Sequence, residues 1–128
     1  MPIRTTRDPG TDLTIHEVTG PADEAEMYSA LQGDGADSQT ALVLWDMTRA
    51  EVAHVTPEIL RRFIRKAADL GQARRGGRTA VVAADDLAYG LARMSEALSD
   101  LAESPYSLQA FRSRGEAMVW LNGEESDA

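Results

Sequence analysis

The chain has 128 residues, of which 43% are hydrophobic, 27% are charged and 5% are aromatic, and its net charge at pH 7 is −8. This acidity disfavours a nucleic-acid partner, because binding a phosphate backbone requires concentrated cations. The absence of cysteine excludes disulfides, thiolate nucleophiles and thiolate metal sites. The N-terminal sequence has no apolar segment typical of a signal peptide, and no run approaches the ~20 apolar residues of a membrane span. We therefore expect a cytoplasmic protein without stable membrane association.

The first segments predict a β-hairpin and then a short helix. Two alternating stretches flank Asp8-Pro9-Gly10, residue types that suit a tight turn. The second stretch places Thr14 and His16 together on its more polar face, and we expect His16 at the surface or in an interface. The helix that follows has an acidic first turn, which suits the helix dipole, and either Gly33 or Gly35 can end it.

Two continuous apolar runs, residues 41–45 and 79–84, predict strands covered on both faces, as in a parallel sheet. The segment between them predicts an amphipathic helix with basic residues on one side. Its apolar face consists of Ile59, Leu60, Phe63, Ile64 and Ala67. Seven of the thirteen basic residues lie between Arg61 and Arg78. They form either a surface for an anionic partner or lipid headgroup, or the solvated face and C-terminal end of this helix, where cations suit the dipole.

After the second apolar run, large apolar residues recur at spacings of 4, 3, 4 and 3, which predicts a helix with one apolar seam. The seam consists of Leu87, Leu91, Met94, Leu98 and Leu101. Gly90 interrupts this helix at a cost of ~1 kcal/mol relative to Ala, and close packing on a neighbouring strand is the simplest compensation. A less buried strand follows, then a last helix opened by Ser113 and Glu116 in capping-box spacing. We expect Met94 and Trp120 in the core.

The predicted elements follow the order β-β-α-β-α-β-α-β-α. Strands that alternate with helices predict an α/β fold, here a layered mixed sheet with parallel crossovers between the later strands. We expect a single domain over residues 1–122 and a frayed acidic tail over residues 123–128.

Several motifs, in this order, resemble the SpoIIAA-like (STAS-like) family of small bacterial proteins, which are related to anti-sigma-factor antagonists and to the CRAL-TRIO lipid-transfer fold. They are Trp45-Asp46 at a strand end, the segment from Tyr89 to Met94, Phe111-Arg112 and the segment from Ala117 to Leu121. The similarity covers nearly the whole chain and implies a SpoIIAA-like sheet with helices.

The resemblance also implies a function. It implies a non-enzymatic regulatory or protein-interaction module without a cofactor, which docks a protein partner and can form a homodimer. The relationship to the CRAL-TRIO fold implies an alternative, namely a carrier or sensor of a small apolar or lipid-like ligand. A carrier requires a cavity between the helix at 54–66, the seam at 87–101 and the sheet. An interaction module requires a filled core and an exposed patch around the 54–66 helix.

Thr56 is the position at which the resemblance implies phosphorylation, because antagonist-type domains carry a regulated hydroxyl at the start of the helix after the central strand. A phosphate there would meet unpaired N–H groups and the positive end of the helix dipole. The residues themselves favour a structural role, with Thr56 as N-cap, Pro57 at the first helical position and Val55 packed on Leu60.

Three carboxylates follow the buried strands: Asp46 after the first run, and Asp85 and Asp86 after the second. Carboxylates gathered at the carboxyl ends of strands could bind Mg²⁺ or accept a phosphoryl group. However, Asp85-Asp86 is also typical of a capped helix start, and Lys66 is the chain's only lysine. We predict no metal site, and since neither histidine pairs with a nucleophile, we predict no catalytic residue.

The sequence therefore yields one candidate surface for a ligand or partner, at the strand ends and the helix starts that follow them. It comprises Trp45, Asp46, His54, Thr56, Asp85, Asp86, Tyr89 and Gly90.

Overall fold

The computed structural model describes residues 3–33 and 39–123. Along the chain the elements are β1 (Ile3–Asp8), β2 (Leu13–Pro21), α1 (Glu24–Gln32), β3 (Leu42–Glu51), α2 (Pro57–Leu70), the 3-10 helix η2 (Gly71–Arg74), β4 (Arg78–Val82), α3 (Asp86–Leu101), β5 (Ser107–Phe111) and α4 (Arg114–Leu121). This order confirms the predicted α/β fold. Gly35 and residues 124–128 of the predicted tail lie outside the described residues.

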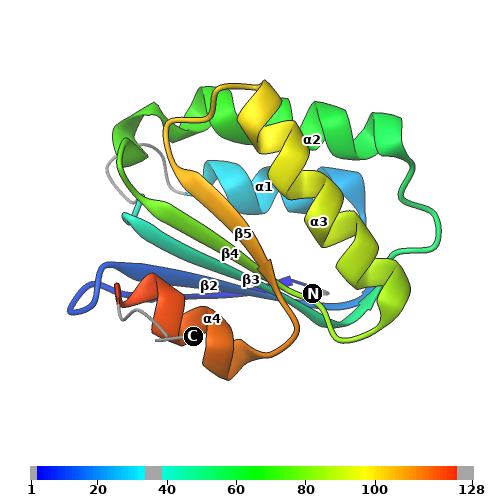
Figure 1. Cartoon of the computed structure of the whole chain (residues 1–128), viewed down its shortest axis with the longest axis horizontal. Helices are drawn as coiled ribbons and strands as arrows, with labels where there is room; N and C mark the ends of the chain where they lie inside the picture. The colour runs from blue at the N-terminus through cyan, green and yellow to red at the C-terminus, as the bar shows by residue number, and fades with distance from the viewer. Residues whose placement is uncertain (1–2, 34–38, 124–128) are drawn as a thin grey trace.

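The described strands form one mixed sheet in the order β1-β2-β3-β4-β5. The β1–β2 hairpin is antiparallel, and the neighbours from β2 to β5 are parallel. Because the strand order runs in one direction, crossovers of the same hand place their helices on the same face. Figure 1 shows α1, α2 and α3 together on one face of the sheet and α4 alone on the other.

Local signals in the sequence set the beginnings of the helices. The hydroxyl of Thr56 accepts a hydrogen bond from the backbone N–H of Ile59, at 3.1 Å, and begins α2. The Ser113 hydroxyl accepts one from the N–H of Glu116, at 3.2 Å, and begins α4. Gly33, with a φ of 50°, ends α1 as predicted. Each of these caps satisfies a backbone group that the helix leaves unpaired.

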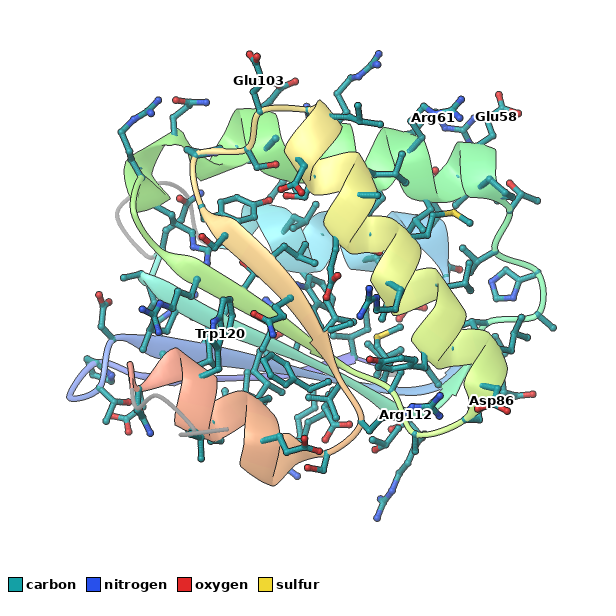
Figure 2. The ribbon with its side chains drawn as sticks, viewed as in Figure 1. Glu58, Arg61, Asp86, Glu103, Arg112 and Trp120 are labelled. Carbon is teal, nitrogen blue, oxygen red and sulfur yellow. The ribbon has the colours of Figure 1, made fainter. Side chains whose placement is uncertain are left out.

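Two apolar clusters lie on the two faces of the sheet. The larger one, between the sheet and the three-helix face, includes Val18, Trp45 and Phe63. The smaller one, beneath α4, includes Leu44 and Val82, which are fully buried. Trp120 is half-buried at the edge of the smaller cluster (Figure 2). Its ring centroid lies 5.5 Å from that of Phe111.

The apolar seam of α3 lies differently from the prediction. The residues that α3 buries are the small ones, Ala88, Ala92, Ser95 and Ser99. Leu87, Met94 and Leu101 are instead 57%, 37% and 80% exposed, so the prediction that Met94 belongs to the core was wrong. Small side chains let a helix lie close to the elements beneath it, which turns the bulky seam toward the edge of the contact.

Gly90 does not pack closely on a neighbouring strand, which was the simplest compensation expected for this glycine. It is exposed on α3, and a Cβ atom added there would meet no heavy atom within 4 Å. Close packing within the described part of the chain therefore does not compensate for this glycine.

None of the helices formed by residues 3–33 and 39–123 is long and apolar enough to cross a membrane.

Candidate ligand-binding site

A cavity of about 140 Å³ lies between the sheet and the three helices on its larger face. The helices α2 and α3 cover it, the strands from β2 to β5 form its floor, and α1 contributes to its wall. A carrier requires a space at this place, although Leu91 is the one residue of the predicted seam that lines it. An apolar cavity of about 150 Å³ is large enough to bind benzene. The space therefore suits a ligand with about one ring.

Most of the cavity wall is apolar. Val43, Trp45 and Met47 line its floor, on alternate positions of β3. Phe63, from α2, meets the Trp45 ring edge-on, with ring centroids 5.6 Å apart and planes at 83°. This geometry is favourable for two aromatic rings and fixes the wall of the cavity.

One end of the cavity, beneath the C-terminus of α2, is polar. We call this region the polar end, and it consists of Thr14, Gln39, Thr40, Arg74, Thr79 and Tyr106. The Thr40 hydroxyl donates to the Leu42 carbonyl at 2.7 Å, so the Thr14 hydroxyl, 2.7 Å away, donates to Thr40. These bonds order the side chains at the polar end.

Arg74 is the charged group of this polar end. Its Nε donates to the Thr40 carbonyl at 2.8 Å, and its Nη2 donates to Thr79 Oγ1 at 2.9 Å. Nη2 also donates to the carbonyls of Ala41 and Arg78, at 3.2 and 3.0 Å. No carboxylate of a described residue pairs with this guanidinium. Burial lowers the pKa of Arg74 to about 10, so it is a cation at pH 7.

Gln39 contributes an unpaired oxygen. Its Nε2 donates to the carbonyl of Leu70, at the end of α2, at 2.8 Å. Its Oε1 is buried and has no hydrogen-bond partner among the described residues. A buried unpaired acceptor costs about 1–3 kcal/mol, so this atom favours a ligand or water that donates to it.

His16 borders the polar end from β2 and is 4% exposed, so its predicted place at the surface was wrong. The more polar face of β2 is the one that the three helices cover. The Nδ1 atom of His16 lies 2.9 Å from the hydroxyl of Thr5. Burial, followed by the charges of Arg74 and Arg7, lowers the pKa of His16 to about 4. The imidazole is therefore neutral at pH 7.

The structure separates the residues of the candidate surface. Trp45 alone among the eight lines the cavity. The next residue, Asp46, points to the opposite face because side chains alternate along a strand. There its Oδ2 lies 3.4 Å from Arg114, and its Oδ1 accepts from the backbone N–H and hydroxyl of Thr48, at 3.0 and 2.7 Å. Asp46 therefore helps to hold α4 to the sheet.

His54 and Thr56 are exposed at the start of α2. The Nε2 atom of His54 donates to the carbonyl of Ala22, at 2.7 Å, and joins the two loops at this edge. The Thr56 hydroxyl is engaged as the N-cap. Both side chains thus have structural partners outside the cavity.

The remaining residues of the candidate surface lie at the start of α3. Asp85 is the N-cap, with its Oδ1 2.8 Å from the N–H of Ala88. Asp86 pairs with Arg112 at 3.0 Å (Figure 2). The guanidinium of Arg112 lies 4.0 Å above the ring of Tyr89. The strand order never reverses, so the carboxyl ends of these strands form no topological switch point. Residues 3–33 and 39–123 contain no cluster of three histidine or carboxylate side chains that could hold a metal.

Sequence reasoning missed Gln39, Arg74 and Tyr106. Arg74 lies in the basic segment that we predicted to form either a surface for an anionic partner or a solvated helix face, and its guanidinium instead lies 4.5 Å from the ring centre of Tyr106. The sequence feature that could have indicated a buried Arg74 is the pair of glycines that flank it, Gly71 and Gly77. A Cβ atom at Gly71 would lie 2.5 Å from the Tyr106 ring, and one at Gly77 would lie 2.3 Å from the carbonyl oxygen of Ala41. Glycines that allow such close contacts indicate a packed segment rather than a free loop.

Comparison with models of known protein families gives no match, and comparison with curated protein sequences gives none either. The similarity to the SpoIIAA-like family therefore stays a prediction from the motifs.

Proposed function

We propose that this protein is a non-enzymatic cytoplasmic carrier or sensor that binds a small, largely apolar ligand in the cavity between its sheet and α2. The observation that carries the proposal is the cavity of about 140 Å³ at this place. Protein interiors are close-packed and contain few voids larger than a water molecule, so an apolar space of this size is unusual. It is the alternative function that the resemblance implied.

The polar groups around the cavity favour binding over catalysis. Arg74 can donate hydrogen bonds and the Oε1 atom of Gln39 can accept one, but neither residue is a nucleophile paired with a base. His16, with a pKa near 4, is a weak general base at pH 7. The groups at the polar end can therefore orient a ligand, and they do not form an acid–base pair for a reaction.

The test is a titration of the ¹⁵N-labelled protein with toluene, followed by amide NMR. We expect saturable shifts at residues that line the cavity, such as Phe63 and Leu91, and unchanged signals from α4. Native mass spectrometry of protein from its own host should show a bound small molecule that is lost on denaturation. Shifts that spread evenly over the surface would overturn the proposal, and so would the absence of shifts both with toluene and with aromatic acids of similar size.

We also propose a protein-interaction role through α3, with a second copy of this chain as the partner. The observation in favour is the exposed row of Leu87, Met94 and Leu101. These residues are spaced seven apart, so they lie on one side of the helix, and they are symmetric about Met94. An antiparallel pair of α3 helices related by a two-fold axis at Met94 would place each Leu87 on the partner's Leu101.

The oligomeric state tests this second role. Sedimentation velocity should show a concentration-dependent dimer, and Met94→Glu should abolish it because two like charges would meet at the axis. Thr6→Glu is the matched control, since it adds the same charge on β1, at the edge of the sheet farthest from β5. A monomer at all concentrations, or a dimer that survives Met94→Glu, would contradict the arrangement.

A further inference from the structure

The polar end of the cavity has hydrogen-bonding groups that the described residues do not satisfy. Nε and Nη2 make all the hydrogen bonds of Arg74 to described residues, which leaves Nη1 without an acceptor there. Gln39 Oε1 is buried without a donor. A donor and an acceptor therefore lie unused at the same end of an apolar cavity. This pattern points to the polar part of a ligand.

The charge at the polar end determines which kind of group fits Arg74. The partners of its guanidinium are neutral, three backbone carbonyls and one hydroxyl, and Arg7, opposite Thr14 in the β1–β2 register, also lines the cavity. The fold has already removed water from much of Arg74, so the dehydration of an incoming anion is the main cost of pairing the two charges. A carboxylate suits this end better than a phosphate because it is the smaller group, and the cavity has room for about one ring.

Gln39 determines what lies beside the anionic group. The Leu70 carbonyl can only accept a hydrogen bond, so it fixes the amide with Nε2 toward α2 and Oε1 away from that bond. A bare carboxylate would be repelled by Oε1. A ligand with a hydroxyl or N–H next to its carboxylate would satisfy both Gln39 and Arg74.

We propose that the cavity binds a small carboxylic acid, with a single ring or a branched chain of similar size, that carries a hydrogen-bond donor beside the carboxylate. The carboxylate would pair with Arg74, the donor would bind Gln39 Oε1, and the apolar body would lie between Trp45 and Phe63. This inference rests on the proposed ligand-binding function and assigns its chemical class.

A matched series of ligands tests the inference by calorimetry and by amide NMR. Toluene lacks the anion, benzoate carries it, 3-hydroxybenzoate adds a donor that cannot reach its own carboxylate, and benzylamine carries the opposite charge. We expect 3-hydroxybenzoate to bind most tightly, about fivefold or more above benzoate, and benzylamine to bind most weakly. One neutral hydrogen bond of about 1 kcal/mol corresponds to a factor of roughly five.

Two variants assign the preference to its residues. Arg74→Met should weaken benzoate binding by about tenfold or more, the effect of a charge-assisted hydrogen bond, and leave toluene binding within about twofold. Gln39→Leu removes the unpaired acceptor together with the bond to the Leu70 carbonyl and keeps the ring site, so it should erase the advantage of 3-hydroxybenzoate over benzoate. Arg65→Met, on the exposed face of α2, is the matched control and should change neither affinity.

The outcomes separate this inference from the proposed function. If toluene shifts the amide signals of cavity residues but neither acid binds more tightly than toluene, the inference is overturned and the proposed ligand binding stands. If the hydroxyl-bearing acid still binds Gln39→Leu more tightly than benzoate does, then water or another group accepts its hydrogen bond. That result would overturn the role of Gln39. If Arg74→Met does not fold, the Gln39→Leu comparison and the benzylamine result still decide. Shifts with none of the four probes would overturn both proposals.

Discussion

The His16 imidazole lies against the Trp45 indole, with ring centroids 4.2 Å apart and planes inclined by 33°. The two residues are direct partners in the register between β2 and β3, on the face that the helices cover. A charged imidazole in this position would lose its hydration, and the charges of Arg74 and Arg7 would repel it. The pair therefore holds a neutral histidine at the border between the apolar wall and the polar end.

This contact predicts a pH-dependent stability. The pKa of His16 is about 4 in the folded protein, against 6.5 for the unperturbed side chain. Between these values the unfolded chain binds the proton and the folded chain does not, so lowering the pH favours unfolding. We expect the protonation of His16 to lower the free energy of unfolding by up to about 3 kcal/mol as the pH falls from 6.5 to 4. Above pH 6.5, His16 should make the free energy of unfolding no more dependent on pH.

Urea denaturation at a series of pH values measures this effect. Carboxylates also titrate in the acid range, so the comparison with His16→Gln isolates the contribution of the histidine. In His16→Gln, the free energy of unfolding should change much less between pH 6.5 and 4 than it does in the wild type. The exposed His54, changed in the same way, is the matched control. Equal slopes for the wild type and His16→Gln would contradict the prediction.

The two neighbouring alanines of α2 test whether the cavity is space that a side chain can occupy. Ala67 lines the cavity, whereas Ala68 is buried but does not line it. Leucine in place of Ala67 should extend into the cavity at little cost to stability and should block toluene binding. Leucine in place of Ala68 meets a packed neighbourhood and should cost about 1–3 kcal/mol. Thermal denaturation with the toluene titration checks both, and equal costs at the two sites would argue against an open cavity.

The sequence allowed prediction of those features that depend on neighbouring residues in the chain. The caps Thr56, Asp85 and Ser113 were recognisable because the N-cap side chain and the N–H it accepts from lie within three residues. The covered strands were recognisable because parallel strands carry continuous apolar runs. These local signals were sufficient for the order of elements and the fold.

Features that depend on distant parts of the chain were not predictable. The spacing of Leu87, Met94 and Leu101 indicates a helix, but which side is buried depends on how closely the small side chains let α3 approach its neighbours. Arg74 lies among exposed basic residues in the sequence, and only the fold brings the carbonyl of Thr40 to its guanidinium. The cavity has the same origin, since it is the space that the helices leave unfilled over the sheet.

Thr56 provides a prediction about the N-terminus of α2, where it is the N-cap. Its hydroxyl is 3.1 Å from the N–H of Ile59, so Thr56→Ala should lower the free energy of unfolding by about 1 kcal/mol. Thr56→Asp should retain most of the stability, because aspartate caps a helix and suits its positive end. Denaturation by urea compares the three proteins. A loss in both variants would indicate that the hydroxyl itself has another partner.

Gly90 provides the last prediction, since an added Cβ atom would meet no heavy atom within 4 Å. Glycine within a helix is less favourable than alanine, so Gly90→Ala should raise the free energy of unfolding by roughly 1 kcal/mol. Gly71→Ala is the contrasting variant, because its Cβ would lie 2.5 Å from the Tyr106 ring and should destabilise the protein. Urea denaturation at low protein concentration measures both. If Gly90→Ala is stabilising there but weakens self-association at high concentration, the partner's α3 approaches closely at this glycine, which is the arrangement that the exposed Met94 row predicts.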